Sequence, residues 1–364
     1  MEITLSGFVL HGTQKCGFSR REKDITTFEI PLTAFSSTVK KILLAVLSLF
    51  ICGVAHSQHE KHSSNFSTLQ QYYNPAFTGF QGSMIKSYYR NSWAGFDGAP
   101  KTFFISGEVN LSDYREDVNA AIEGEEWMQK AGIEHSMGLS LLYDSYGPFV
   151  ENQIFLSYRS RINLTQKISL QAGGAVAYHR QSLDGNKLTS DEANDPTLSK
   201  YSNQTSRSGR IDFNLGLAIT GQDFYAGYAM QNIVGSRRDA DNHYFQSNSE
   251  VQYIVQGGFR KAISEKVGLI FNALLRFDKQ FDESIEGQIK GVFYNTAWLG
   301  FGYRNNLAYS LNVGFRMKEL RIGYAFEIPT GDAHMTGNGT NEILVTYDLK
   351  KILYPRLTHR MSMW

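Results

Sequence analysis

The stretch LAYSLNVGFRM, residues 307–317, decides the fold, because its side chains alternate between two series. The apolar series is Leu307, Tyr309, Leu311, Val313 and Phe315, and the polar or small series is Ala308, Ser310, Asn312, Gly314 and Arg316. Successive side chains of a β-strand point to opposite faces of the sheet. The stretch therefore predicts a strand with one apolar face and one polar face.

The same period of two recurs along the chain. The clearer segments are 167–179, 211–219, 251–259, 266–277, 285–294, 297–304, 307–317, 319–328 and 341–349, and the weaker ones lie near 83–91, 101–111, 136–143, 150–160 and 223–231. Each has about ten residues, the length that a tilted strand needs to cross a bilayer. The polar faces are rich in Gly, Asn and Arg, and Tyr or Phe recurs near strand ends, as in membrane barrels. We predict an all-β fold, a transmembrane outer-membrane β-barrel of about fourteen antiparallel strands, with a soluble β-sandwich as the alternative.

The lengths of the connections test this prediction independently. In outer-membrane barrels, short periplasmic turns alternate with longer outer loops. The short connections lie at 161–166, 221–222, 264–265, 295–296 and 318, and the long ones at 184–207, 232–247 and 329–340 have the opposite parity. The acidic insert 112–134, weakly helical around 116–130, is the exception, because parity places it among the short turns. This pattern assigns both chain termini to the periplasm.

The segment VKKILLAVLSLFICGVAHSQ, residues 39–58, has the order of an export signal. A basic start is followed by an apolar run too short to span a bilayer comfortably, and then by an A-x-S pattern that predicts cleavage between Ser57 and Gln58. We interpret residues 1–38 as an extension that precedes a start at Val39. The expected division is therefore extension plus signal peptide at 1–57, barrel at 58–349 and a basic tail at 350–364. Both cysteines, Cys16 and Cys52, precede the cleavage site, so the mature chain needs neither disulfides nor a reducing compartment.

Composition and motifs argue against several classes of protein. The net charge is +1 and no basic helix is interleaved with aromatic residues, so we expect no nucleic-acid partner. The nine histidines are scattered, and no H-E-x-x-H motif or Cys/His ligand spacing occurs. No nucleophile elbow and no phosphate-binding glycine loop is present. We therefore expect no enzyme, no catalytic residue, no cofactor and no metal site.

The segment YRNSWAGFDGAPKTFFIS, residues 89–106, carries more than a hairpin loop requires. A turn needs Gly or Asn at a positive-φ position and tolerates Pro beside it, but it does not need Trp93 and Phe96. These aromatic side chains offer rigid area for a partner. The alternative is an inward-folded loop whose aromatic residues fill the barrel mouth or pack on the wall. Arg90 and Lys101 flank the hairpin, and each either forms an ion pair in the lumen or binds a partner.

Five segments together resemble the PorP/SprF family, outer-membrane proteins of the type IX secretion system. They are YYNPAFTGF (72–80), YRNSWAGFDGAPKTFFIS (89–106), YDSYGP (143–148), NDPTL (194–198) and GTNEILVTYDL (339–349). The residues that match the first two family motifs are Asn74, Pro75, Ala76, Gly79, Tyr89, Arg90, Asn91, Trp93, Gly95, Phe96, Gly98, Ala99, Pro100, Lys101 and Thr102. The resemblance runs from about residue 67 to residue 349. The insert 112–134 and the tail 350–364 depart from the family pattern.

The resemblance implies an outer-membrane component of type IX secretion that binds proteins rather than performing chemistry. Its implied partners are the type IX secretion machinery and secreted proteins with a C-terminal sorting domain, including gliding-type adhesins, besides outer-membrane lipid. The implied role is to assist their secretion or surface attachment, with the matched motif residues as candidate partner contacts. A general porin or small-solute channel is the alternative function.

Charged residues on the polar strand faces offer two interpretations of the lumen. They are Arg159, Arg210, Asp212, Arg260, Arg276, Glu286, Lys290, Arg304, Arg316, Arg321 and Glu327. A positive lining selects anions in an open pore. A mutually satisfied network fills a closed barrel instead, and we predict this arrangement. The sequence leaves open whether residues 58–80 fill the lumen or extend into the periplasm.

Overall fold

The structure is a computed structural model that describes residues 62–95, 98–114, 133–165, 167–188, 205–234, 251–277, 283–305, 307–330 and 339–350. The predicted export signal, its cleavage site at Ser57 and Gln58, most of the insert 112–134 and the tail after residue 350 lie outside the described residues. Phe96, a member of the second motif, also lies outside them.

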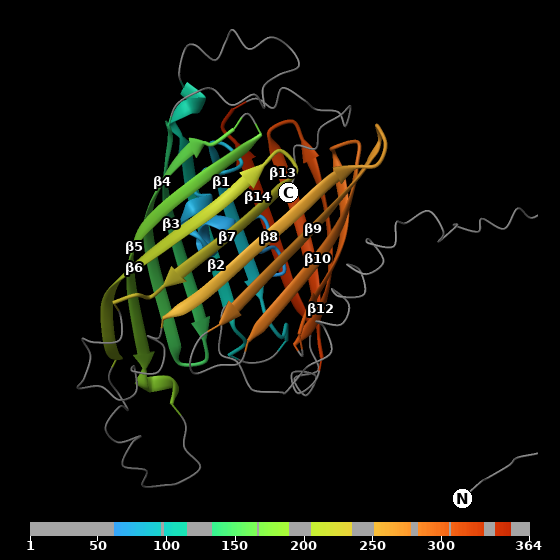
Figure 1. The fold of residues 1–364 in the computed structure, drawn as a ribbon. Coiled ribbons are helices and arrows are strands. Elements are labelled where there is room, and N and C mark those ends of the chain that lie inside the picture. Colours follow the sequence, from blue (N-terminus) through green and yellow to red (C-terminus); the bar gives the residue numbers. More distant parts are fainter. Residues whose placement is uncertain are drawn as a thin grey trace, which may run out of the picture. The chain divides into compact units, whose positions relative to one another are not determined.

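Fourteen strands form one closed antiparallel barrel in which each strand pairs with its neighbours in sequence (Figure 1). They are β1 (Met84–Asn91), β2 (Lys101–Asn110), β3 (Ile133–Tyr146), β4 (Phe149–Asn163), β5 (Ile168–Asp184), β6 (Thr205–Gly221), β7 (Phe224–Gln231), β8 (Gln252–Ala262), β9 (Val267–Phe277), β10 (Ser284–Phe293), β11 (Ala297–Arg304), β12 (Ala308–Met317), β13 (Leu320–Pro329) and β14 (Thr340–Asp348). The barrel closes where β1 pairs with β14, with Met84 opposite Asp348. The predicted fold and strand number are confirmed.

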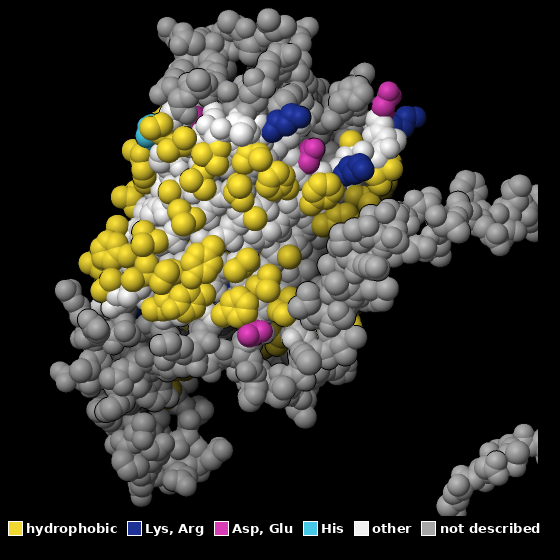
Figure 2. All heavy atoms as spheres, in the orientation of Figure 1, with side chains coloured by type: hydrophobic (Ala, Val, Ile, Leu, Met, Phe, Trp, Pro, Cys, Tyr) yellow, Lys and Arg dark blue, Asp and Glu magenta, His cyan; other side chains and the backbone are white. Residues whose placement is uncertain are grey.

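The alternation that predicts the strands also sorts the two faces of the wall. In β12, Tyr309, Leu311, Val313 and Phe315 are exposed, while Ala308, Ser310, Asn312, Gly314 and Arg316 are buried. Hydrophobic side chains cover the outer wall in Figure 2, and charged ones appear near its ends. An apolar outer band with polar residues inside is the arrangement that a bilayer demands of a barrel.

Strands β5 and β6 are longer than the sequence predicts. The prediction for this hairpin ends at residue 179 and resumes at 211, but β5 continues to Asp184 and β6 begins at Thr205. Most of the added residues, such as Arg180, Gln181 and Ser208, are polar, and the apolar Leu183 is buried. A strand that extends beyond the apolar band has no reason to alternate in hydrophobicity, so its period is not visible in the sequence.

The two ends of the barrel differ in their connections. At one end, called the short-turn end, two to four residues join β4 to β5, β6 to β7, β8 to β9, β10 to β11 and β12 to β13. At the other, called the long-loop end, lie the connections after β1, β3, β5, β7, β9, β11 and β13. The predicted short turns are confirmed. The insert after β2 begins with a 3-10 helix, η3 (Leu111–Tyr114), at the short-turn end.

Helices contribute little to the described part of the chain. Within it, no helix is long and apolar enough to cross a membrane.

The free-energy cost of placing a charged side chain on the lipid face should depend on where along its strand the residue lies. Leu311 lies midway along β12 and Met317 ends it, and both are exposed on the same face. We expect Leu311→Arg to lower the free energy of unfolding by about 2–4 kcal/mol and Met317→Arg by about 0–1 kcal/mol, because the bilayer midplane solvates a cation worst. Urea unfolding of the barrel in lipid vesicles measures both. Equal losses in the two variants would contradict a membrane-spanning wall.

Candidate functional site

Residues 62–83, called the plug, run through the lumen before the first strand begins. They include a short helix, α2 (Gln70–Tyr73), and a 3-10 turn, η2 (Pro75–Phe77). In Figure 1 this segment is drawn in blue inside the barrel. Most of its side chains are buried, including the polar Ser67 and Asn74. The lumen is therefore filled by the chain's own N-terminal segment as well as by wall side chains.

Three strand glycines hold the η2 turn against the wall. A Cβ at Gly173 of β5 would come within 2.5 Å of the Ala76 nitrogen. One at Gly216 of β6 would overlap the Asn74 side chain, and one at Gly227 of β7 would lie 2.6 Å from the Phe77 ring. Glycine within a strand marks a close approach of another group. Gly173, Gly216 and Gly227, called the glycine cradle, leave the space that the turn occupies.

Asn74 links the turn to the wall and also caps it. Its side-chain oxygen accepts a hydrogen bond of 2.9 Å from the Ala76 backbone N–H, which fixes the start of η2. Its amide nitrogen donates at 3.3 Å to the backbone carbonyls of Leu217 and Tyr228. Pro75 stands at the first position of the turn, where no backbone donor is needed. The Asn-Pro-Ala motif therefore has a defined structural role.

Gly79 completes the first motif at the short-turn end of the plug. Its φ is +62°, a left-handed conformation that favours glycine. Its backbone N–H donates to a Glu108 carboxylate oxygen at 2.7 Å, and Thr78 beside it donates to the Ser157 hydroxyl at 3.0 Å. A side chain at residue 79 would also meet Ser136 at 2.9 Å. Glycine is thus required here for both conformation and space.

Aromatic rings pack the plug against two sides of the wall. Tyr72 lies edge-on to Phe104 and Phe155, with ring centroids 5.7 Å and 5.6 Å apart. Phe77 lies edge-on to Tyr225 at 5.2 Å. Such pairs contribute about 0.5–1.5 kcal/mol each beyond the area that they bury. These ring contacts hold the plug against both sides of the wall.

The first residues of the plug contact acidic side chains near the long-loop end. The Ser64 backbone N–H donates to Glu342 at 3.0 Å, and the Ser64 hydroxyl donates to Glu327 at 2.8 Å. The Asn65 amide donates to the second Glu342 oxygen at 2.9 Å. The plug therefore donates hydrogen bonds to two buried carboxylates.

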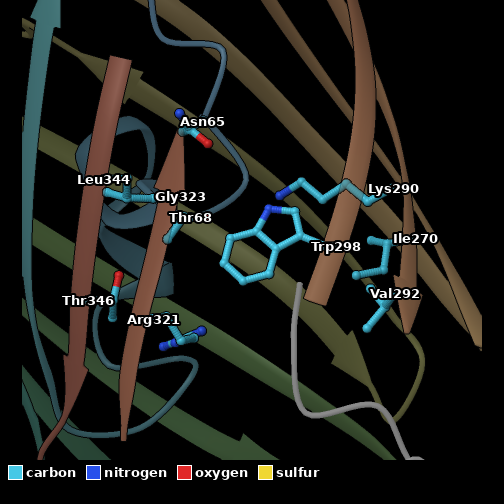
Figure 3. A pocket seen from close by; sticks show the side chains of 10 residues that line it. All are labelled: Asn65, Thr68, Ile270, Lys290, Val292, Trp298, Arg321, Gly323, Leu344 and Thr346. Atoms are coloured by element: carbon cyan, nitrogen blue, oxygen red, sulfur yellow. The ribbon is translucent and has the colours of Figure 1, made fainter. Parts of the chain in front are cut away.

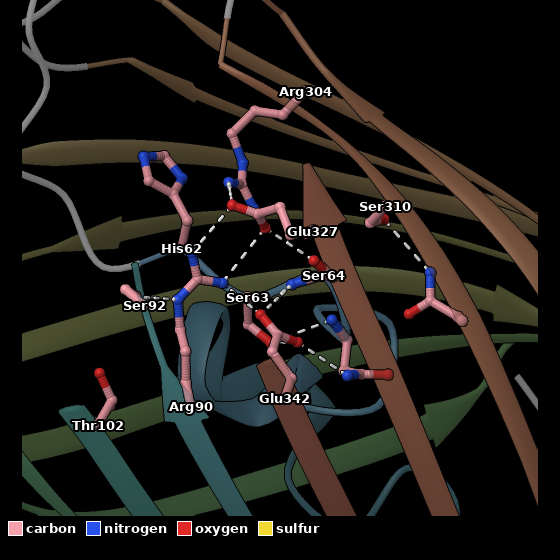
Figure 4. Close-up of polar contacts among 12 residues, drawn as sticks. His62, Ser63, Ser64, Arg90, Ser92, Thr102, Arg304, Ser310, Glu327 and Glu342 are labelled. Carbon is pink, nitrogen blue, oxygen red and sulfur yellow. Dashed lines mark hydrogen bonds and ion pairs between the residues drawn. The ribbon is translucent and has the colours of Figure 1, made fainter. Parts of the chain in front are cut away.

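The same carboxylates belong to an ion-pair network that runs along one part of the wall, from β1 through β14 and β13 to β9 (Figure 4). Arg90 contacts Glu342 and lies 3.0 Å from Glu327. Arg304 lies 3.2 Å from Glu327 and 3.2 Å from Glu286, which lies 2.8 Å from Arg276 in turn. The predicted interior network is confirmed for these residues, whereas Glu342 was not among the predicted members.

The remaining predicted lumen charges have separate partners. Arg210 lies 2.8 Å from Asp212, and Arg321 lies 2.7 Å from Asp348. Arg159 is fully buried and donates to Ser136 and Gln171. Arg260 donates to the Gln222 carbonyl at 2.9 Å, Lys290 donates to the plug residue Ser67 at 2.7 Å, and Arg316 is buried. A further pair, Lys86 and Glu108 at 2.6 Å, was not predicted.

Two small cavities lie within the described part of the lumen. One has a volume of about 20 Å³ and is lined by Thr68 of the plug and by Trp298, Lys290 and Leu344 of the wall (Figure 3). The other, of about 10 Å³, lies between Ser64 and the strands β10–β13. A single water molecule needs about 10–15 Å³ measured in this way. Neither space admits a larger solute.

His62 begins the plug in a strongly positive environment. Its Nδ1 atom contacts the Arg276 guanidinium and lies 3.2 Å from a Glu286 oxygen. Burial, together with the charges of Arg276 and Arg304, lowers the pKa of His62 to about 3. The imidazole is therefore neutral at neutral pH, and the charge of Glu286 is balanced by the two arginines instead.

The second motif occupies the β1–β2 hairpin at the long-loop end. Arg90 faces the lumen, whereas Tyr89 is exposed on the lipid side and Lys101 is exposed at the start of β2. Trp93 is half-buried with a φ of +51°. Backbone hydrogen bonds join Ala94 to Gly339 and Gly98 to Gly147, so the hairpin is tied to its neighbours at this end.

The other motif residues complete this hairpin. Gly95 and Gly98 adopt positive φ angles of 99° and 70° and are exposed. Pro100 accepts a hydrogen bond of 2.9 Å from the Ser92 N–H, and Asn91 is half-buried at the end of β1. The structure thus separates the two motifs: Asn74, Pro75 and Gly79 lie inside the barrel, and the second motif lies at its mouth.

The sequence left open whether residues 58–80 fill the lumen, and it did not predict where the plug contacts the wall. The strand glycines were noted only as part of the polar faces, and nothing in their spacing says which segment approaches them. The described residues do not suggest a metal site. Among the described residues, no group of three or more His, Cys, Asp or Glu side chains is arranged to hold a metal ion.

A closed fourteen-strand barrel with an apolar outer band and an occupied lumen defines a plugged β-barrel of the outer-membrane class. The chain belongs to the PorP/SprF family of type IX secretion system membrane proteins, whose family model matches residues 55–347. It is thus an outer-membrane component of type IX secretion, as the resemblance predicts. No curated protein matches the chain.

Several solved structures match the chain at low similarity. Omp33 of Acinetobacter baumannii has a TM-score of 0.41 at 9% identity, covering 73% of this chain and 96% of that one. A Pseudomonas aeruginosa FadL homologue has a TM-score of 0.42 at 9% identity, covering 76% and 93%. The CymD monoaromatic hydrocarbon channel has a TM-score of 0.40 at 10% identity, covering 82% and 94%. At these values nothing about ligands follows from the likeness.

Adding a methyl group to the glycine cradle should unseat the plug. Gly173→Ala places a Cβ against the backbone of Pro75 and Ala76, which cannot move as a flexible side chain does. We expect a cost of about 1–3 kcal/mol, as for other overpacked sites. Chymotrypsin should then cleave the folded barrel within residues 62–83 faster than in the wild type. The control is Gly107→Ala, because a Cβ there meets nothing within 4 Å. Equal protection of the plug in both variants would contradict the cradle.

Lowering the pH should destabilise the contacts that hold His62 in the lumen. The pKa of His62 is about 3 in the folded state, below its ordinary value of 6.5. Its contribution to stability is therefore complete above pH 6.5 and is lost progressively as the pH falls toward 3. We expect the ratio of the hydrogen-exchange rate of residues 62–69 in the wild type to that in His62→Gln to rise as the pH falls from 7 to 5. Identical pH profiles for the two proteins would refute this.

Proposed function

We propose that this barrel assists the secretion or surface attachment of proteins with a C-terminal sorting domain, by binding them rather than by conducting solutes. Family membership over residues 55–347 supports the link to type IX secretion. The occupied lumen is the observation that carries the choice of mechanism. A barrel whose interior is filled by its own chain offers its mouths and its wall to other proteins.

The long-loop mouth is the proposed docking surface. There the half-buried Trp93 and the exposed Gly95 and Gly98 lie in a hairpin fixed by backbone hydrogen bonds to two neighbouring loops. Rigid aromatic side chains beside glycines suit the centre of a protein interface, because little conformational entropy is lost on binding. Arg90 is not part of this surface, since its ion pairs hold it in the lumen.

We assign the short-turn end to the periplasm and the long-loop end to the cell surface. Short turns face the periplasm in outer-membrane barrels, and the position of the export signal in the sequence agrees with insertion from that side. The secretion machinery then meets the short-turn end, where η3 begins the acidic insert and where β14 ends with Asp348. The motifs Asn74-Pro75 and Gly79 contact a partner only when the plug has left its seat.

A general porin fits the lumen poorly. The plug hydrogen-bonds to both sides of the barrel, and the two cavities described above hold about one water molecule each. Porins keep an aqueous channel instead.

Deleting the gene tests the proposal at the level of function. Quantitative proteomics of the cell surface and the culture medium should show the loss or release of one or a few proteins with C-terminal sorting domains. An unchanged set of exported proteins, together with altered uptake of small solutes, would favour the porin.

The double substitution Trp93→Ala with Phe96→Ala tests the docking surface itself. We expect secretion of the dependent protein to fall at least about tenfold, because hot-spot aromatic residues each carry about 2 kcal/mol or more. The control is Phe315→Ala, which removes an exposed aromatic residue from the lipid-facing side of β12, away from the proposed docking surface. Normal secretion by the double variant, with its barrel folded, would remove the proposed contact.

A further inference from the structure

Strand β6 extends beyond its neighbour β7 at the long-loop end. It pairs with β5 over all of its 17 residues, but with β7 only over residues 215–220. Just beyond this stretch, the backbone N–H of Ile233, two residues after the end of β7, donates to the Phe213 carbonyl at 3.1 Å. No strand in the described part of the chain pairs with the rest of this edge, residues 205–212, which we call the open edge.

Four residues turn their backbone groups toward the open edge. In an antiparallel strand, the N–H and C=O groups of one residue point to the same side, and successive residues alternate between the two sides. The Phe213 carbonyl faces the β7 side, so the backbone groups of Ile211, Gly209, Arg207 and Thr205 face that side as well. The residues between them direct their backbone groups to β5. The open edge therefore presents a row of backbone donors and acceptors.

Polar side chains place this edge in water beyond the lipid. The apolar outer face of β6 ends with the exposed Ile211, and the exposed Arg207 follows it toward the long-loop end. On β5, the exposed Tyr178 is followed by the exposed Arg180. Tyrosine is typical of the membrane interface. Backbone groups cannot stay unpaired in hydrocarbon, whereas water satisfies them outside it. An edge in this position can receive a partner from solution.

The length and composition of the open edge suit an added strand. Residues 205–212 span roughly 26 Å, and an average strand has only about five or six residues. In β-augmentation, an extended peptide completes the hydrogen bonds of such an edge, and its alternate side chains give specificity. Many proteins block their edges with proline, and the open edge contains none.

Arg207 determines the chemistry of the peptide that fits. Its side chain is exposed on the outer face, and no ion pair joins it to another residue in the described ranges. The other two charges of this edge, Arg210 and Asp212, lie 2.8 Å apart on the lumen side. A carboxylate on the added strand, opposite Arg207, would form a cross-strand ion pair. The edge therefore favours an acidic segment.

A second copy of the chain does not fit the open edge. Two identical edges pair antiparallel about a two-fold axis perpendicular to the sheet, which turns one barrel over relative to the other. All copies in one membrane share one orientation. A parallel pairing needs a two-fold axis along the strands, which are tilted by about 35–45° in such barrels, so the two barrels could not both stand upright in the bilayer. The occupant is therefore a different chain.

We infer that an extended segment of the exported protein, with Asp or Glu at alternate positions, adds a strand to the open edge of β6. The inference rests on the proposed function and deepens it, because it assigns a second contact at the mouth that carries Trp93. Backbone hydrogen bonds to Thr205, Arg207, Gly209 and Ile211 supply affinity, and the Arg207 side chain selects an acidic segment.

Hydrogen exchange of the purified barrel tests whether the edge is open. NMR of the barrel in detergent micelles resolves single amides. We expect the amides of Arg207, Gly209 and Ile211 to exchange at least about tenfold faster than those of Ser206 and Ser208, whose N–H groups face β5. Equal protection of both sets would show that the edge is already covered in the barrel alone, and would overturn the inference.

Variants at Arg207 test the occupant in cells that lack the chromosomal gene. Arg207→Pro removes the edge N–H together with the charge, whereas Arg207→Ala removes the charge alone. Proline is tolerated on an edge whose N–H faces solvent, and each variant is first checked for the heat-dependent shift in electrophoretic mobility of a folded barrel. Arg207→Glu reverses the charge and keeps the N–H. Its control is Arg180→Glu, which makes the same change on the same face, one strand away from the edge.

The readout is the surface level of the exported proteins that the gene deletion removes. We expect Arg207→Pro and Arg207→Glu to lower this level at least about fivefold, Arg207→Ala about twofold and Arg180→Glu less than about twofold, since only the first two oppose strand addition directly. Wild-type levels in both Arg207→Pro and Arg207→Glu would overturn the inference and leave the proposed function standing. Equal losses in Arg207→Glu and Arg180→Glu would also overturn it. A gene deletion that changes no exported protein would overturn the proposed function, and the inference with it.

Discussion

The contact between the Asn74–Phe77 turn and the glycine cradle is the constraint on which the rest of the interior depends. Fourteen strands enclose a lumen wider than their own side chains fill, since about eight strands are the number at which side chains alone suffice. The turn approaches the wall so closely that β-carbons on Gly173, Gly216 and Gly227 would overlap it. Wall and plug are therefore complementary at the level of single atoms, as in a protein core.

The pairing of charged side chains in the lumen follows from this packing. Once the plug excludes water, every charge in the lumen needs a partner, because an unpaired buried charge costs several kcal/mol. One network pairs three arginines, Arg90, Arg276 and Arg304, with three glutamates, Glu286, Glu327 and Glu342. The plug adds hydrogen bonds from Ser64 to Glu327 and from Asn65 to Glu342. The plug is thus held by wall geometry in one half of the barrel and by charge in the other. Removing either contact exposes buried carboxylates or leaves an empty cradle.

The wall was predictable from the sequence, and the plug was not. A barrel wall imposes a period of two on the hydrophobicity of its side chains. Strands such as 307–317 can therefore be recognised in the sequence, and so can the short turns between them. The plug HSSNFSTLQQYYNPAF has no period, because its contacts reach many different strands at irregular spacing. Glycine in a strand signals a close approach but does not say of what. Arg90 and Lys101 were equivalent in the sequence, yet Arg90 shares the lumen parity of β1 and Lys101 lies on the outward parity of β2.

The most direct test of the account is the single-channel conductance of the purified barrel in planar lipid bilayers, with and without residues 62–80. Both proteins must first show the mobility shift of a folded barrel. The account predicts that the complete barrel is electrically silent and that the shortened one opens a stable conductance. A large, steady conductance from the complete barrel would contradict a closed lumen, and a silent shortened barrel would show that the plug is not what closes it.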